Sequence, residues 1–127
     1  ETVLEKEPEV AAELDINQRY LDLVREGMFL VGTEGYCKNA FANLPIKAAA
    51  KTGTSEVVRV IDGNKVEGNN GFLISYAPYE DPEISVAVVV ESATAGSLTA
   101  VVVADIYDYY FSAKEMQTVQ QYNQLLS

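Results

Sequence analysis

Four consecutive residues, Lys51, Thr52, Gly53 and Thr54, are the most chemically specific feature of the sequence, and we call them the KTGT segment. They offer a cation, two hydroxyl groups and a position without a side chain, where a ligand can approach the backbone closely. Such a set suits one wall of an acyl-transfer site. Four common residues alone are more typical of an ordinary strand with an exposed lysine, so the rest of the sequence has to decide.

Residues for several other chemistries are missing or isolated. The chain of 127 residues has no histidine and one cysteine, Cys37. Cysteine–histidine pairs, serine–histidine–acid triads and imidazole-bound metals therefore cannot be built from it, and we expect no metal or other cofactor. We interpret Cys37, whose adjacent cation is Lys38, as an incidental loop cysteine rather than a reactive thiol. Asp105 and Asp108 have a spacing that could bind a metal but is more typical of a solvent-exposed helix face.

Composition and charge limit the partners and the domain count. The formal net charge of −10 repels phosphate backbones and anionic lipid surfaces, so we do not expect nucleic acid as a partner. With 48% hydrophobic residues, the chain can bury the core of one modest domain. No stretch of the sequence approaches the roughly 20 apolar residues of a membrane-spanning helix.

A helix is expected before the KTGT segment. Asn17 can cap it, Gly32 ends it, and apolar residues recur at steps of three and four over residues 18–31. Residues 33–45 have the glycine, asparagine and proline content of a connecting loop. The apolar face of the expected helix consists of Tyr20, Leu21, Val24, Met28 and Val31.

The KTGT segment itself lies in a strand-like run that a turn at Asp62, Gly63 and Asn64 folds back as a hairpin. The predicted fold class is α+β, a three-stranded antiparallel meander packed by an N-terminal and a C-terminal helix. A KTGT strand at the sheet edge could pair with an extended, peptide-like ligand. We expect strands over residues 46–61, 72–76 and 84–91, with a further turn at residues 68–71.

Two helices are expected at the C-terminal end. Ser97 can cap the first, over residues 98–111, and Ser112 with Glu115 predicts a capping box for a short second helix over residues 113–125. The first helix is expected to pack through a broad apolar face. That face includes Val101, Val102, Ile106 and Tyr109 or Tyr110.

The surroundings of the KTGT segment resemble the class B penicillin-binding proteins. Lys-Thr-Gly is the third signature of the serine acyl-transferases, where it accompanies Ser-x-x-Lys and Ser-x-Asn. The resemblance covers residues 17–111, which we interpret as the C-terminal part of a transpeptidase domain, after an irregular lead-in (1–16) and before a helical tail (112–127). The matching runs are residues 24–28, 33–35, 41–45, 50–54, 71–78, 81–91 and 105–111.

The resemblance implies a portion of the serine β-lactamase/transpeptidase fold and roles for the KTGT segment. Lys51 would contribute positive charge near the nucleophilic serine, and Thr52 and Thr54 would bind the carboxylate of a peptidoglycan stem peptide or a β-lactam. The N–H of Thr54 would be an oxyanion donor, and Gly53 would let the ligand approach. Family members cross-link the cell wall on the extracytoplasmic face of the bacterial membrane.

Two signatures of the family are absent from this sequence. No serine is followed by lysine at the third position or by asparagine at the second. The chain also starts at Glu1 rather than methionine, so we expect a C-terminal portion that needs the missing N-terminal part, is inactive alone and could self-associate. The alternatives are a non-catalytic interaction module on a transpeptidase scaffold and a relative of the serine β-lactamases.

Overall fold

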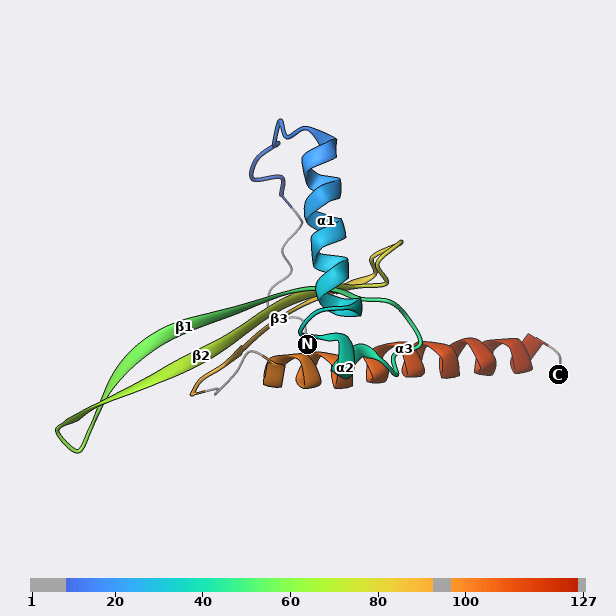
Figure 1. Cartoon of the computed structure of the whole chain (residues 1–127). Helices are drawn as coiled ribbons and strands as arrows, with labels where there is room; N and C mark the ends of the chain where they lie inside the picture. The colour runs from blue at the N-terminus through green and yellow to red at the C-terminus, as the bar shows by residue number, and fades with distance from the viewer. Residues whose placement is uncertain (1–8, 93–96, 126–127) are drawn as a thin grey trace.

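The fold consists of one antiparallel sheet with a long helix along one face and a second helix standing on the other (Figure 1). The computed structural model describes residues 9–92 and 97–125. The predicted α+β class and three-stranded meander are confirmed. In chain order the elements are α1 (Gln18–Thr33), α2 (Lys38–Phe41), β1 (Ala49–Ile61), β2 (Asn64–Ala77), β3 (Ile84–Val90) and α3 (Ser97–Leu125).

The sheet has the order β1-β2-β3, and its strands differ in length. β1 and β2 pair from Ala49 opposite Tyr76 to Ile61 opposite Asn64, whereas β3 pairs only with the Gly71–Ala77 part of β2. Residues 55–61 and 64–70 therefore continue beyond β3 as a two-stranded extension, which we call the ribbon (Figure 1).

The turn of this hairpin was predicted correctly, but the start of the second strand was not. Asp62 and Gly63 both have positive φ, 51° and 81°, as a tight two-residue hairpin turn requires. β2 begins directly after this turn, at Asn64 rather than at residue 72, and the expected turn at residues 68–71 is part of the strand. Pairing with β1 overrides the poor strand propensity of glycine and asparagine there.

The core lies between the sheet and α3. Leu73 and Ala77 of β2 pack with Ala100, Val103 and Tyr107 of α3, and all are at most 1% exposed. The predicted packing face of this helix was wrong: Val101, Val102, Ile106, Tyr109 and Tyr110 are each at least 36% exposed. The apolar residues of this helix are spread around its circumference rather than gathered on one face, so periodicity could not select the buried face.

The helices differ from expectation mainly at their ends. The Asn17 cap is confirmed, because its Oδ1 accepts a hydrogen bond of 3.0 Å from the N–H of Arg19, but α1 continues past Val31 to Thr33. α2 is an unexpected short helix inside the predicted loop. α3 is one helix, so the predicted capping box at Ser112 does not form a boundary.

None of the described helices has the length and apolar character needed to cross a bilayer.

Three expectations fall on residues that the structure does not describe. The first half of the irregular lead-in, residues 1–8, lies outside the described residues, as do the last two residues of the helical tail and the capping side chain of Ser97. Residues 9–17 are irregular, as expected. The two segment boundaries proposed along the chain, after residues 16 and 111, stay predictions.

Candidate functional site

The KTGT segment lies near the start of β1, and the described sheet has no strand on the other side of β1. Register places Lys51, Thr52, Gly53 and Thr54 opposite residues 74, 73, 72 and 71 of β2. The backbone groups on the outer side of β1 are therefore not engaged by a described strand. This edge position is the one from which a strand can pair with an extended ligand.

The side chains of the segment alternate between the two faces of the sheet. Lys51 lies opposite exposed Ile74, whereas Thr52 lies opposite Leu73, which is 1% exposed in the core. Lys51 and Thr54 are exposed, and Thr52 is half-buried. The Nζ of Lys51 donates a hydrogen bond to the carbonyl oxygen of Thr52, which holds the ammonium group close to the strand.

Gly53 is not required by the described fold itself. Its φ lies outside the left-handed region, unlike that of Gly63. A Cβ added to Gly53 would meet only the Cβ of Phe72, at 3.4 Å, which is an ordinary contact. The absence of a side chain here is therefore explained neither by backbone strain nor by packing against the described residues.

A second glycine fixes where β1 begins. Gly32, in the last turn of α1, is buried against Ala48, and an added Cβ would lie 2.1 Å from the Ala48 carbonyl oxygen. The end of α1 thus contacts the backbone directly before β1, three residues ahead of Lys51. From the sequence Gly32 could be predicted only as a helix end, because its contact with Ala48 is not local.

A buried chain of hydrogen bonds holds β1 from the α3 side. The hydroxyl of Tyr107 donates to Ser75 Oγ at 2.8 Å, and Ser75 Oγ donates to the carbonyl oxygen of Ala49 at 2.7 Å. Burial raises the pKa of Tyr107, and the hydrogen bond to Ser75 acts in the opposite direction. A tyrosine kept neutral donates reliably, so the chain ties α3, β2 and β1 together two residues before the KTGT segment. No local signal in the sequence indicated this pair.

The other candidate residues do not assemble into a site. Cys37 is fully buried in the core, and burial raises the pKa of its thiol, which keeps it protonated and unreactive at neutral pH. Asp105 and Asp108 are exposed on α3. Within the described part of the chain, no group of three or more acidic, cysteine or histidine residues could hold a metal ion.

Several known proteins are similar to this chain in sequence. A family model, the penicillin binding protein transpeptidase domain, matches residues 1–108. The chain is 31% identical over 121 residues to penicillin-binding protein 2A of Bacillus subtilis and 29% identical over 105 residues to the peptidoglycan D,D-transpeptidase MrdA of Escherichia coli. These matches cover 87% and 75% of this chain, but the chain spans only 17% of the length of either relative.

A solved structure agrees with these sequence matches. The structure of Pseudomonas aeruginosa PBP2 in complex with WCK 5153 superposes with a TM-score of 0.65 and 27% sequence identity. The superposition covers 84% of this chain and 23% of that one. The three-stranded sheet with its helices is therefore part of a larger known fold.

Proposed function

Because this chain belongs to the penicillin-binding protein transpeptidase family, we propose that it supplies the substrate-binding strand of a peptidoglycan D,D-transpeptidase. The family predicted from the sequence is thereby confirmed, while the activity is our proposal. One observation carries the proposal: the KTGT segment lies on a sheet edge, where Gly53 lacks a side chain for no reason within the described fold.

Each residue of the segment has a proposed role in acyl transfer. The ammonium group of Lys51, exposed on the strand, assists proton movement at the nucleophilic serine. The hydroxyls of Thr52 and Thr54 bind the carboxylate of the stem peptide or of a β-lactam. The N–H of Thr54 stabilises the oxyanion that forms at the attacked carbonyl, and such a donor contributes on the order of 3 kcal/mol to the transition state.

The reaction proceeds in two transfers. A serine attacks the penultimate D-alanine carbonyl, so that the acyl group passes to the serine oxygen and the last D-alanine leaves. The acyl group then passes to an amine of a neighbouring strand, and the serine is regenerated. β-Lactams acylate the same serine.

The nucleophile and its base have to come from residues outside this sequence. The chain contains neither Ser-x-x-Lys nor Ser-x-Asn. We propose that the remainder of the protein provides both on the extracytoplasmic face of the bacterial membrane, and that this chain is inactive without it.

An exposed apolar face on α1 supports the need for the remainder of the protein. Tyr20, Leu23 and Val24 are 64%, 55% and 60% exposed. Side chains of this kind gather at interfaces more often than on isolated surfaces. We propose that another part of the same protein covers this face and that the chain alone self-associates through it. Sedimentation of the chain as a monomer over a range of concentrations would contradict this.

A labelled penicillin tests the proposed function. We expect covalent label on the full-length protein and none on the 127-residue chain alone. Label on the chain alone would show that it carries its own nucleophile. A full-length protein that takes no label would favour the non-catalytic module, and turnover of a chromogenic cephalosporin would favour a β-lactamase.

A further inference from the structure

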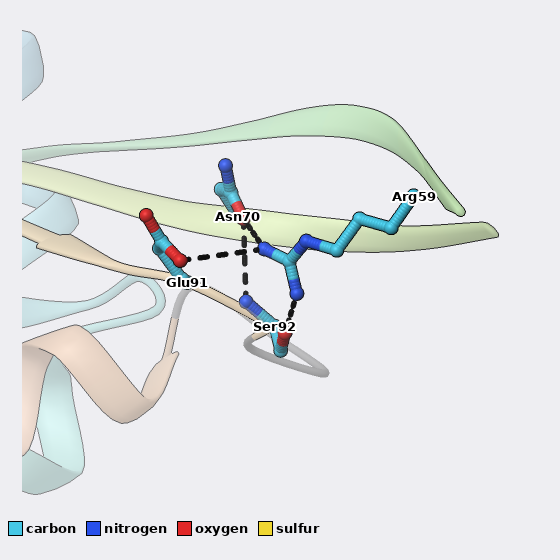
Figure 2. A network of polar contacts seen from close by, with 4 residues as sticks. All are labelled: Arg59, Asn70, Glu91 and Ser92. Carbon is cyan, nitrogen blue, oxygen red and sulfur yellow. Dashed lines mark hydrogen bonds and ion pairs between the residues drawn. The ribbon is translucent and has the colours of Figure 1, made fainter. Parts of the chain in front are cut away.

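Arg59 of β1 connects β2 with the two residues that follow β3 through its guanidinium group (Figure 2). Its Nη2 donates to Asn70 Oδ1 of β2 at 3.0 Å, and its Nη1 donates to the hydroxyl of Ser92, just after β3. The same Nη2 lies 3.7 Å from Glu91 Oε2. Asn70 Oδ1 also accepts the N–H of Ser92 at 3.2 Å. We call Arg59, Asn70, Glu91 and Ser92 the Arg59 network.

The network lies where the sheet narrows from three strands to two. Thr54, Gly71 and Val90 form the last row that contains all three strands. Asn70 pairs with Ser55 in the next row, where β3 has ended. The network therefore begins one residue beyond Thr54, at the base of the ribbon (Figures 1 and 2).

The ribbon needs support at this place. An isolated two-stranded hairpin is at best marginally stable in water, and most residues near the turn of the ribbon are exposed. A guanidinium group suits the role, because its planar fork can hold two acceptors at fixed positions. Its hydrogen bonds to Asn70 and Ser92 contribute more than the contact with Glu91, whose side chain is 82% exposed.

The backbone of Ser92 is a second indication that the contacts at the base of the ribbon form a specific arrangement. Its φ is 58°, in the left-handed region that a non-glycine residue rarely adopts. Its N–H and its hydroxyl are both held by the network, by Asn70 and by Arg59 respectively. The end of β3 is thus bound to the first pair of ribbon residues beyond the Thr54 row.

We propose that Arg59 is a positioning residue for acyl transfer: it fixes the base of the ribbon and thereby holds the N–H of Thr54 in place for the oxyanion. Arg59 itself does not touch the substrate. This inference rests on the proposed function, because it assigns Arg59 to the same reaction. Strand pairing in the ribbon can open from its turn, and the Arg59 network stops this opening before it reaches the row of Thr54.

Two measurements on the full-length protein with Arg59→Met test this. In Arg59→Met we expect the amides of residues 55–70 to exchange hydrogen at least about tenfold faster than in the wild type, and the amides of residues 72–77 to change little. A change of about tenfold is the effect of losing one charge-assisted hydrogen bond. We expect the limiting rate of acylation by a labelled penicillin to fall roughly tenfold, less than the loss of an entire oxyanion donor. The apparent dissociation constant should change less than about twofold, since ground-state binding is kept.

Matched variants separate positioning from charge and from general stability. Arg59→Lys keeps the charge but not the planar fork of the guanidinium group. It should therefore recover less than about half of the acylation rate that Arg59→Met loses relative to the wild type. Lys65→Met removes a cation from the turn end of the same ribbon, where Lys65 is exposed, and should leave acylation unchanged. Asn70→Ala disrupts the same network without removing a charge and should also speed exchange in the ribbon, because Asn70 Oδ1 accepts from both Arg59 and the N–H of Ser92.

The outcomes distinguish this inference from the proposed function. Faster exchange in the ribbon together with slower acylation supports it. Normal exchange, or normal acylation despite faster exchange, overturns it while leaving the proposed function intact. A wild-type protein that takes no label overturns the proposed function and the role of Arg59 with it.

Discussion

Replacing Gly53 with valine separates the fold from the proposed ligand-binding role of the KTGT segment. Gly53 has no left-handed backbone to preserve, and its added Cβ would lie 3.4 Å from the Cβ of Phe72, an ordinary contact. Valine also favours strands, and its side chain would stand on a sheet edge. We therefore expect the free energy of unfolding to change by less than about 1 kcal/mol.

Acylation should respond far more strongly than stability. A valine side chain at position 53 would stand beside the N–H of Thr54, where the ligand has to approach the strand. Loss of one oxyanion donor lowers the rate about 100- to 1000-fold. We expect the second-order rate constant for acylation by a labelled penicillin to fall by at least roughly 100-fold.

The assay follows labelling over time in the full-length protein, with denaturant unfolding measured on the same samples. Gly68→Val is the matched control, because it makes the same substitution on the partner strand, where no atom lies within 4 Å of the added Cβ. This control should label at the wild-type rate. Wild-type labelling of a folded Gly53→Val protein would refute the placement of the ligand along this strand.

Three further predictions concern the supports of the KTGT segment. Gly32→Ala should lower the free energy of unfolding by about 1–3 kcal/mol, because the added Cβ would lie 2.1 Å from the Ala48 oxygen; unchanged denaturant unfolding would contradict that contact. Tyr107→Phe should cost about 1 kcal/mol in the same assay through the lost hydrogen bond to Ser75, whereas Ser75→Ala should cost more because it also removes the hydrogen bond to Ala49; no loss in either variant would contradict this chain. Burial raises the pKa values of Cys37 and Tyr107 above their ordinary 9.0 and 10.0, so the unfolded state releases these protons first. The contribution of these two groups to the free energy of unfolding should be constant below about pH 9 and fall above it, and Cys37→Ala should remove the earlier part of that fall.

Features that depend on neighbouring residues could be predicted from the sequence. The Asn17 cap, the turn at Asp62 and Gly63, and the meander order follow from short-range chemistry, and the structure confirms all three. The residue types of the KTGT segment likewise indicated an acyl-transfer wall before any fold was known. The family follows from the same local runs of sequence, and the match over residues 1–108 confirms it.

Features that depend on distant partners could not be predicted. The start of β2 at Asn64 is set by pairing with β1, which outweighs the weak strand propensity of residues 68–71. The buried face of α3 carries Ala100, Val103 and Tyr107, whose contacts with the sheet include the hydrogen bond from Tyr107 to Ser75. The apolar periodicity had favoured Val102 and Ile106 instead.

The sequence by itself therefore determined the family and predicted the chemistry of the KTGT segment, because both inferences rest on adjacent residues. Only the tertiary structure decided that the segment lies on a sheet edge, that Gly32 and Ser75 hold its strand from opposite sides, and that the guanidinium group of Arg59 reaches Asn70, one row beyond Thr54. The physical reason is that each of these contacts joins residues far apart in the chain. Their geometry is fixed only when strands pair and helices pack.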